Sequence, residues 1–356
     1  MLLPSPSTSS GDAPVRSTDN DAAAARVSAV KQGYLLDPFA KHLVPRAHLL
    51  PLRPPLINIG TYVRTAAIDS LVDQWLELAE KASQTCQIIS LGAGSDTRFW
   101  RIASGKLSDG LGTYVEVDFP EITTKKAMAI KKSKDLLTTL GDPSHVSLDQ
   151  GGTALRSTRY HLLPLDLRVD PEDVLKSVLA TPQPNGLNLV DPSKPTLLIF
   201  ECVLAYMAPE LSSRLLEWFV KWSQTSPCGI LGCIVYEMFG LNDAFGRVMV
   251  NNLKERSITL PGAEAYSTIE SLPGRFLNTG FTAARALTLK EIRKSYIPRS
   301  ELDRIAGLEF LDETEELDLV LDHYAISWGL FFVNNEIAVK WGHWGLVDRD
   351  DSDINM

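Results

Sequence analysis

Residues 86–97 have the sequence CQIISLGAGSDT, in which a short apolar run ends at Gly92 and Gly94. An apolar run of this length, closed by glycine, is typical of a buried β-strand. Glycines directly after a strand let the backbone pass close to a ligand, because no Cβ is in the way. This stretch therefore predicts a buried strand with a ligand-binding turn at its carboxyl end.

The sequence that follows alternates between apolar runs and segments with helical spacing. Further strands are expected over 113–117, 160–165, 196–200, 229–236, 282–287 and 324–330. Helices are expected over 122–137, 171–179, 209–222, 289–295 and 299–306. Strands separated by helices indicate parallel βαβ units, so we predict an α/β fold with a doubly wound, Rossmann-like sheet.

The segments before and within this pattern carry different signals. Residues 1–20 are rich in Ser, Thr, Pro and Asp and cannot bury enough apolar surface to offset ordering, so we expect disorder there. Residues 22–30 are alanine-rich and helical in propensity, and apolar residues recur at helical spacing in 59–82, which places helices ahead of the first strand. Residues 245–280 interrupt the strand–helix rhythm and predict a lid in what we expect to be a single domain over 21–356.

Composition excludes several classes of partner. The chain of 356 residues has a formal net charge of -9, which argues against general binding to nucleic acid. The four cysteines form no C-x-x-C pair, which favours reduced thiols and an intracellular protein. No signal peptide and no apolar run of membrane-spanning length is visible, so we expect a soluble cytoplasmic protein without membrane partners, acting as a monomer.

Acidic residues follow several of the expected strands. Asp118, Asp166 and Glu201 each end a strand, as Gly92 and Gly94 do. In open α/β sheets, ligands bind outside the carboxyl ends of the strands. A glycine turn followed by an acid at the next strand end suits a nucleoside-containing cofactor, because the acid can accept hydrogen bonds from ribose hydroxyls.

Two cofactor classes share these features. A dinucleotide site favours G-x-G-x-x-G, but Thr97 stands at the third glycine position and Asp96 would bring negative charge to a pyrophosphate. S-adenosylmethionine carries a positive sulfonium and no phosphate. An acid-lined pocket therefore suits it better than it suits a nicotinamide dinucleotide.

The same acids have structural readings. Asp118 could cap a turn before Pro120, and Asp166 could cap the turn into Arg168. Glu201 follows a strongly apolar strand and is expected to be partly buried, so it needs a partner. That partner is either a ligand or an internal arginine.

Several motifs resemble those of the leucine carboxyl methyltransferase family. The resemblance extends over nearly all of the chain from about residue 20 and rests on residues 89–100, 116–120, 198–207 and 308–313, with Gly33-Tyr34, Asp37-Pro38, Tyr62-Val63-Arg64, His323-Tyr324 and Trp328. It implies a fold of the S-adenosylmethionine-dependent methyltransferase type, with a seven-stranded sheet whose last strand is antiparallel and a helical N-terminal cover over 21–85.

The resemblance also implies a set of residues that bind S-adenosyl-L-methionine. Asp118 would hold the ribose, Glu201 would lie beside the methionine portion, and Arg64 would pair with the cofactor carboxylate, with Arg26 near the same site. The full set is Arg26, Arg64, Gly92, Asp118, Asp166, Leu167 and Glu201, where Gly92 lines the cofactor and Asp166 with Leu167 contacts the adenine.

The acceptor implied by the resemblance is the C-terminal leucine of the catalytic subunit of type 2A protein phosphatases. A terminal carboxylate has a pKa of about 3.5 and is ionised at neutral pH, so it needs no general base. We therefore expect neither a catalytic side chain nor a metal. Tyr206 is a candidate for the substrate pocket, and its alternative reading is a packed aromatic residue.

Other functions stay open at this point. One alternative is a carboxyl or O-methyltransferase acting on a small molecule or on a modified tRNA base. A nicotinamide-dependent oxidoreductase is another, against which Asp96 and Thr97 argue. The last is a binding module that grips a phosphatase tail without turnover.

Overall fold

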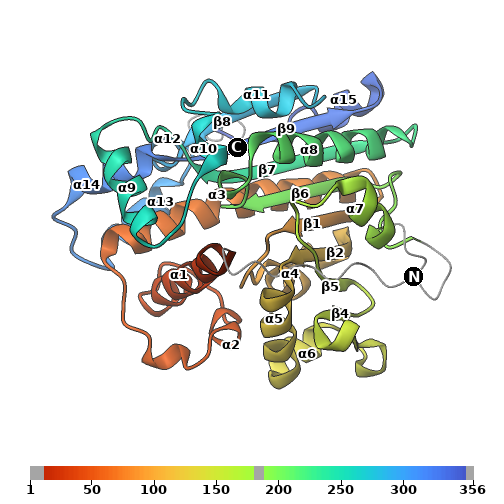
Figure 1. Ribbon diagram of the computed structural model, residues 1–356, viewed down its shortest axis with the longest axis horizontal. Coiled ribbons are helices and arrows are strands. Elements are labelled where there is room, and N and C mark those ends of the chain that lie inside the picture. Colours follow the sequence, from red (N-terminus) through yellow and green to blue (C-terminus); the bar gives the residue numbers. More distant parts are fainter. Residues whose placement is uncertain (1–11, 180–187, 350–356) are drawn as a thin grey trace.

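The computed structural model describes residues 12–179 and 188–349 and has a nine-stranded sheet at its centre (Figure 1). The strands are β1 Cys86–Leu91, β2 Leu111–Asp118, β3 Ser147–Asp149, β4 Ala154–Arg156, β5 Tyr160–Pro164, β6 Thr196–Glu201, β7 Ile230–Met238, β8 Ala283–Thr288 and β9 Tyr324–Phe332. Their order across the sheet is β3-β4-β5-β2-β1-β6-β7-β9-β8.

The strand directions confirm the predicted α/β class. Strands β5, β2, β1, β6 and β7 pair in parallel, and β9 runs antiparallel between β7 and β8. The count differs from the seven strands expected, because the hairpin of β3 and β4 extends the sheet beyond β5. Each hairpin strand has only three residues, which is too short for an apolar pattern to reveal.

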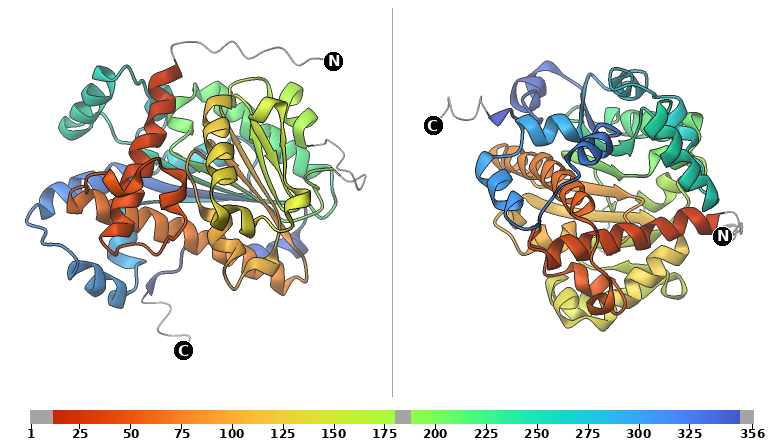
Figure 2. Two further views of the ribbon diagram at one scale, coloured as in Figure 1. Left: turned by 90° about the horizontal axis from the view of Figure 1, so that it is seen from below. Right: turned by 90° about the vertical axis from the view of Figure 1, so that its left-hand side faces the viewer.

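Helices cover both faces of the sheet, as Figure 2 shows. One apolar cluster joins the sheet to α3 Pro55–Lys81, α4 Arg98–Ala103, α5 Pro120–Lys132, α6 Lys134–Thr139, α12 Leu289–Ser295, α13 Arg299–Ala306, α14 Thr314–Asp322 and α15 Asn335–Trp341. The opposite cluster includes α7 Pro171–Leu179, α8 Pro209–Gln224 and α11 Leu272–Leu277. Within the described ranges, none of the helices is long and apolar enough to cross a membrane.

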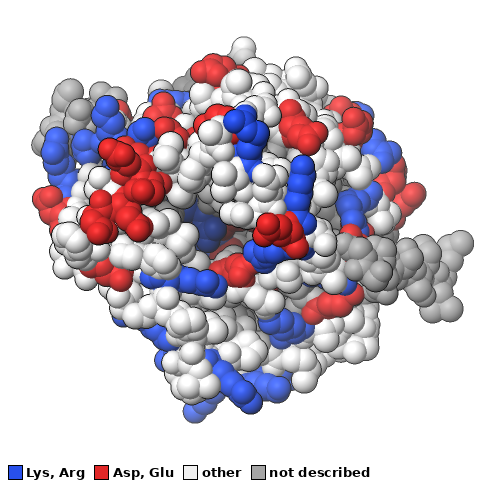
Figure 3. All heavy atoms as spheres, turned by 60° about the vertical axis from the view of Figure 1, so that its left-hand side comes forward, with Lys and Arg blue, Asp and Glu red and all other residues white. Residues whose placement is uncertain are grey.

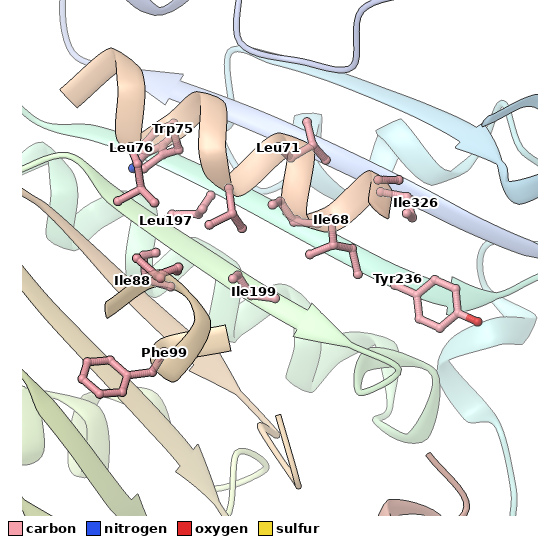
Figure 4. Packing of buried hydrophobic residues seen from close by; sticks show 14 of the residues in the cluster. Ile68, Leu71, Trp75, Leu76, Ile88, Phe99, Leu197, Ile199, Tyr236 and Ile326 are labelled. Atoms are coloured by element: carbon pink, nitrogen blue, oxygen red, sulfur yellow. The ribbon is translucent and has the colours of Figure 1, made fainter. Parts of the chain in front are cut away.

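Alternation along the strands divides the core between these two layers. In β6, Leu197 and Ile199 belong to the first cluster, whereas Leu198 and Phe200 belong to the second. This is the period of two expected of a strand buried on both faces. Figure 4 shows α3 lying along the first face, with its apolar side chains against those of the strands.

Helix α1, Ala13–Lys31, corrects one expectation and lies away from the sheet with the short helix α2, Ala40–Leu43 (Figure 1). Residues 1–20 were expected to be disordered, but the helix already begins at Ala13; residues 1–11 lie outside the described ranges. The buried residues of α1 all lie between Ala23 and Ala29. Its first half therefore lacks the apolar signal on which the sequence prediction depended.

The segment 245–280, for which a lid was predicted, lies partly in the core and partly outside it. It contains α9 Ala244–Glu255, α10 Pro261–Glu264 and α11. Gly246 is the one residue of α9 that is buried, whereas Phe276 of α11 is fully buried in the core. Only α9 and the loop after it project beside α1, and both Figure 1 and Figure 2 show this.

Candidate functional site

A cavity of about 370 Å³ opens at the carboxyl ends of β1, β2, β5 and β6, under α1. Figure 3 shows a hollow with charged side chains in and around it on the side of the molecule that carries α1 and α9. The cavity is lined by every residue predicted for the site: Arg26, Arg64, Gly92, Asp118, Asp166, Leu167, Glu201 and Tyr206. Residues from six separate parts of the chain thus meet where parallel strand ends were expected to converge.

The glycine loop follows β1 directly and contains two residues in the left-handed backbone region. Gly92 and Gly94 both have positive φ, of +70° and +49°. A Cβ on Gly92 would lie 2.5 Å from Cγ2 of Val203. Glycine is therefore required here by the packing of Val203, whether or not a ligand is bound. The N–H of Gly92 donates to the carbonyl of Val117 at 2.7 Å, which ties the loop to the end of β2.

Asp118 holds this loop from the next strand end. One of its oxygens, Oδ2, accepts a hydrogen bond from the N–H of Gly94 at 2.7 Å, and Oδ1 accepts one from the N–H of Phe119 at 2.7 Å. Burial raises the pKa of Asp118 to about 6, although both hydrogen bonds oppose that shift. Each oxygen keeps a free lone pair, so the carboxylate can still accept hydrogen bonds from a ligand in the cavity.

Asp166 behaves as its structural reading predicted. Its Oδ1 accepts a hydrogen bond from the backbone N–H of Arg168 at 3.0 Å, which caps the turn after β5. The Arg168 guanidinium pairs with Asp166 at 2.6 Å and with Asp12, the residue before α1, at 2.7 Å. Asp166 and Leu167 nevertheless line the cavity, so the capping role and a ligand-binding role are compatible.

Glu201 has internal arginine partners. Its Oε1 lies 3.0 Å from Nε of Arg64, and its Oε2 lies 3.3 Å from Nη2 of Arg98. The Arg64 guanidinium also lies 5.1 Å from the ring centroid of Tyr236, a cation–π contact. Glu201 and Arg64 therefore form one charged unit that faces the cavity, in contrast to the isolated acid considered from the sequence.

Arg98 is the main residue of this region that sequence reasoning missed. Its side chain is 1% exposed and contacts Asp69 at 3.0 Å and Asp96 at 2.6 Å, in addition to Glu201. Burial lowers the pKa of Arg98, but these carboxylates outweigh that effect and raise it well above the usual value. Arg98 balances the negative charge of Asp96. The charge of Asp96 is therefore a weaker argument against a dinucleotide cofactor than it was from the sequence alone.

Arg26 enters the cavity from α1. Its Nε donates to Oδ2 of Asp37 at 2.5 Å, and its Nη1 donates to Oγ1 of Thr65 at 3.4 Å. Its Nη2 is buried and has no hydrogen-bond partner among the described residues. A buried guanidinium with an unused donor is suited to an anionic ligand group, because leaving the donor unpaired is costly.

The part of the cavity near β7 and β9 is more aromatic. The rings of Tyr236 and Tyr324 stack at a centroid distance of 5.5 Å, and Oη of Tyr206 lies 3.7 Å from Sγ of Cys202. Met207, Met238 and Leu253 complete this lining. Across the mouth of the cavity, Arg256 after α9 pairs with Asp21 of α1 at 2.5 Å.

Sequence comparisons identify the family. The sequence model of the leucine carboxyl methyltransferase family matches residues 15–220. The protein belongs to the leucine carboxyl methyltransferase family. It is 45% identical over 350 residues to leucine carboxyl methyltransferase 1 of Cryptococcus neoformans (strain JEC21), covering 92% of this chain and 95% of that protein. The Aspergillus fumigatus protein of the same name is 38% identical, covering 96% and 89%, and that of Bos taurus is 37% identical, covering 90% and 91%.

Membership of the leucine carboxyl methyltransferase family makes the protein a methyltransferase and sets aside the oxidoreductase alternative. It also agrees with the sheet, in which an antiparallel last strand lies between two strands parallel to each other. The individual roles of the cavity residues remain predictions, although the structure brings these residues together.

Proposed function

We propose that the protein transfers a methyl group from S-adenosyl-L-methionine to the α-carboxylate of the C-terminal leucine of the catalytic subunit of type 2A protein phosphatases. One observation carries the proposal: a single cavity joins a charged part at the ends of β1, β2 and β5 to an aromatic part at the ends of β7 and β9. The charged part suits the cofactor, and the aromatic part suits an apolar side chain that carries a carboxylate.

The residues of the charged part fit the groups of S-adenosylmethionine. Asp118 can accept hydrogen bonds from ribose hydroxyls, and the unused donor of Arg26 can bind the carboxylate of the methionine portion. Arg64 is a second candidate for that carboxylate, with Glu201 holding it in place. Gly92, Asp166 and Leu167 complete the proposed binding set.

The aromatic part fits the acceptor. Its walls of Met238, Leu253, Tyr236 and Tyr324 offer apolar surface to a leucine side chain. Tyr206 is positioned there as a candidate donor to the acceptor carboxylate, because its hydroxyl lies beside the weakly polar thiol of Cys202 in this part of the cavity. These residues would orient the acceptor and keep water from its oxygen.

Little acid–base chemistry is required of the protein. The bound cofactor supplies a methyl group on a sulfonium, whose leaving group is a neutral thioether. The acceptor carboxylate has a pKa of about 3.5 and is already ionised, so no side chain has to remove a proton. Orientation and water exclusion by the cavity walls can then contribute about 7–11 kcal/mol to the acceleration.

A methyl-transfer assay tests the proposal. Labelled S-adenosylmethionine is incubated with the protein and a phosphatase catalytic subunit, either complete or lacking its terminal leucine. We expect base-labile label on the complete subunit and none on the shortened one. Equal labelling of both substrates would overturn the acceptor assignment, and transfer to RNA or to free carboxylic acids would favour the alternative acceptors.

A further inference from the structure

Asp19 of α1 binds the glycine loop although it is distant from it in the sequence. Its Oδ1 accepts a hydrogen bond from the N–H of Ser95 at 2.7 Å, and its Oδ2 accepts one from Oγ of Ser95 at 3.0 Å. Nζ of Lys125, on α5, also lies 3.1 Å from Oδ2. The Asp19 side chain is 10% exposed, so water competes little for these contacts.

The glycine loop packs closely against the Asp19 carboxylate at Gly94. A Cβ on Gly94 would lie 2.7 Å from Oδ1 of Asp19, and Gly94 has φ of +49°. The two successive amides of the loop point to different acids, since that of Gly94 donates to Asp118 and that of Ser95 donates to Asp19. The loop is therefore held between β2 on one side and α1 on the other.

Asp12, just before α1, pairs with Arg168 and not with the glycine loop, and the pairs made by Asp21 and Arg16 are exposed or long. Asp21 pairs with Arg256 through side chains that are 51% and 48% exposed, and exposed ion pairs contribute little to stability. Arg16 lies 3.8 Å from Glu121, at the outer limit of an ion pair. Asp19 is thus the well-buried polar contact through which this half of α1 reaches the cofactor loop.

We propose that Asp19 is a positioning residue for the cofactor site, which holds the glycine loop in its binding conformation only while α1 is docked. Glycine has more backbone freedom to lose than any other residue, so a loop with glycines at 92 and 94 is costly to order. Ordering it before the ligand arrives removes that cost from binding. This inference rests on the proposed function for the identity of the cofactor.

Three variants test the role of Asp19. Asp19→Ala removes every contact, Asp19→Asn keeps one acceptor for the Ser95 amide, and Asn20→Ala alters an exposed neighbour on the same helix that contacts Lys125 but does not line the cavity. Calorimetric titration with S-adenosylmethionine is expected to show about tenfold weaker binding for Asp19→Ala, the loss typical of a charged hydrogen bond. Asp19→Asn should lose less, and Asn20→Ala should match the wild type.

Further readouts separate positioning from a general loss of stability. At saturating cofactor, Asp19→Ala should keep a kcat close to that of the wild type while its KM for the cofactor rises. In the cofactor-free protein, hydrogen exchange in residues 92–97 should become faster in Asp19→Ala but not in Asn20→Ala. Unchanged affinity and unchanged exchange in Asp19→Ala would overturn the inference, whereas a wild type that binds no S-adenosylmethionine would overturn the proposed function instead.

A double-mutant cycle tests the contact with Gly94 directly. In the wild-type background, Gly94→Ala brings a Cβ against the Asp19 carboxylate and should weaken cofactor binding strongly. In the Asp19→Ala background that overlap is gone, so the fold-change caused by Gly94→Ala should be smaller. Equal fold-changes in the two backgrounds would show that Asp19 does not act through the loop.

Discussion

Replacing Glu201 by glutamine tests the charged unit that faces the cavity. The change keeps the shape of the side chain but removes the charge that lies 3.0 Å from Nε of Arg64 and 3.3 Å from Nη2 of Arg98. Arg98 keeps Asp69 and Asp96 as partners. Arg64 loses the only carboxylate within ion-pair distance of it among the described residues, so most of the cost comes from Arg64.

The size of the effect follows from burial. Two unit charges at 4 Å attract by about 4 kcal/mol at an effective dielectric constant of about 20, and breaking a buried pair costs about 3–5 kcal/mol. The side chains of Glu201 and Arg64 are 20% and 15% exposed, so water recovers part of this energy. We therefore expect Glu201→Gln to lower the free energy of unfolding by about 2 kcal/mol.

Denaturant unfolding followed by circular dichroism measures this loss. The matched control is Glu210→Gln, at an exposed position in the first turn of α8, where a change within about 0.5 kcal/mol is expected. Calorimetric titration of the folded variant should also show weaker cofactor binding, because Arg64 is no longer held. A loss in Glu201→Gln no larger than that in the control would refute the assignment of Glu201 and Arg64 as one unit.

Two further predictions concern Gly92 in the glycine loop and Asp118, which accepts a hydrogen bond from that loop. Gly92→Ala should lower the free energy of unfolding by about 3 kcal/mol, from a left-handed backbone and from overlap with Val203, and Val203→Ala should relieve part of this loss in a thermal unfolding measurement. Because burial raises the pKa of Asp118 to about 6 and ribose hydroxyls prefer the ionised acid, cofactor affinity should be constant above that pH and fall as pH drops below it. Titrations over this range should show no such fall for Asp118→Asn, and an identical pH dependence in that variant would exclude Asp118 as its source.

The convergence of the site was predictable from the sequence because it depends on the backbone. Parallel strands present their carboxyl ends at one edge of a sheet whatever their side chains do. Finding the ends of β1, β2 and β6 in the sequence was therefore enough to bring Gly92, Asp118 and Glu201 together. The predicted bounds of the later helices, 289–295 and 299–306, also match α12 and α13.

The partners of the charged residues could not be predicted in this way. Arg98 binds Asp69 and Glu201, which lie 29 and 103 residues away along the chain. No local period records such contacts, because they depend on how α3, α4 and β6 pack together. The sequence left two possible partners for Glu201, a ligand or an internal arginine, and only the packed structure shows which arginines lie beside it.

The first half of α1 was missed for a different reason. This half of the helix buries little apolar surface. Its polar residues, such as Asp19 and Asp21, instead form hydrogen bonds and ion pairs with other elements. Polar composition predicts disorder when a segment has nothing to bind. Here the acids have partners on the glycine loop and beyond α9, so the same composition is compatible with an ordered helix.

The two sides of the cavity consequently differ in how easily they can open. Asp96 lines the cavity and pairs with Arg98 behind it; the two side chains are 9% and 1% exposed, so separating them would leave charges buried without partners. Asp21 and Arg256 also line the cavity, and their pair is about half exposed, so its separation costs little because water replaces each partner. A polypeptide tail therefore has its least costly entrance between α1 and α9. That entrance lies beside Leu253 of α9, which lines the aromatic part of the cavity.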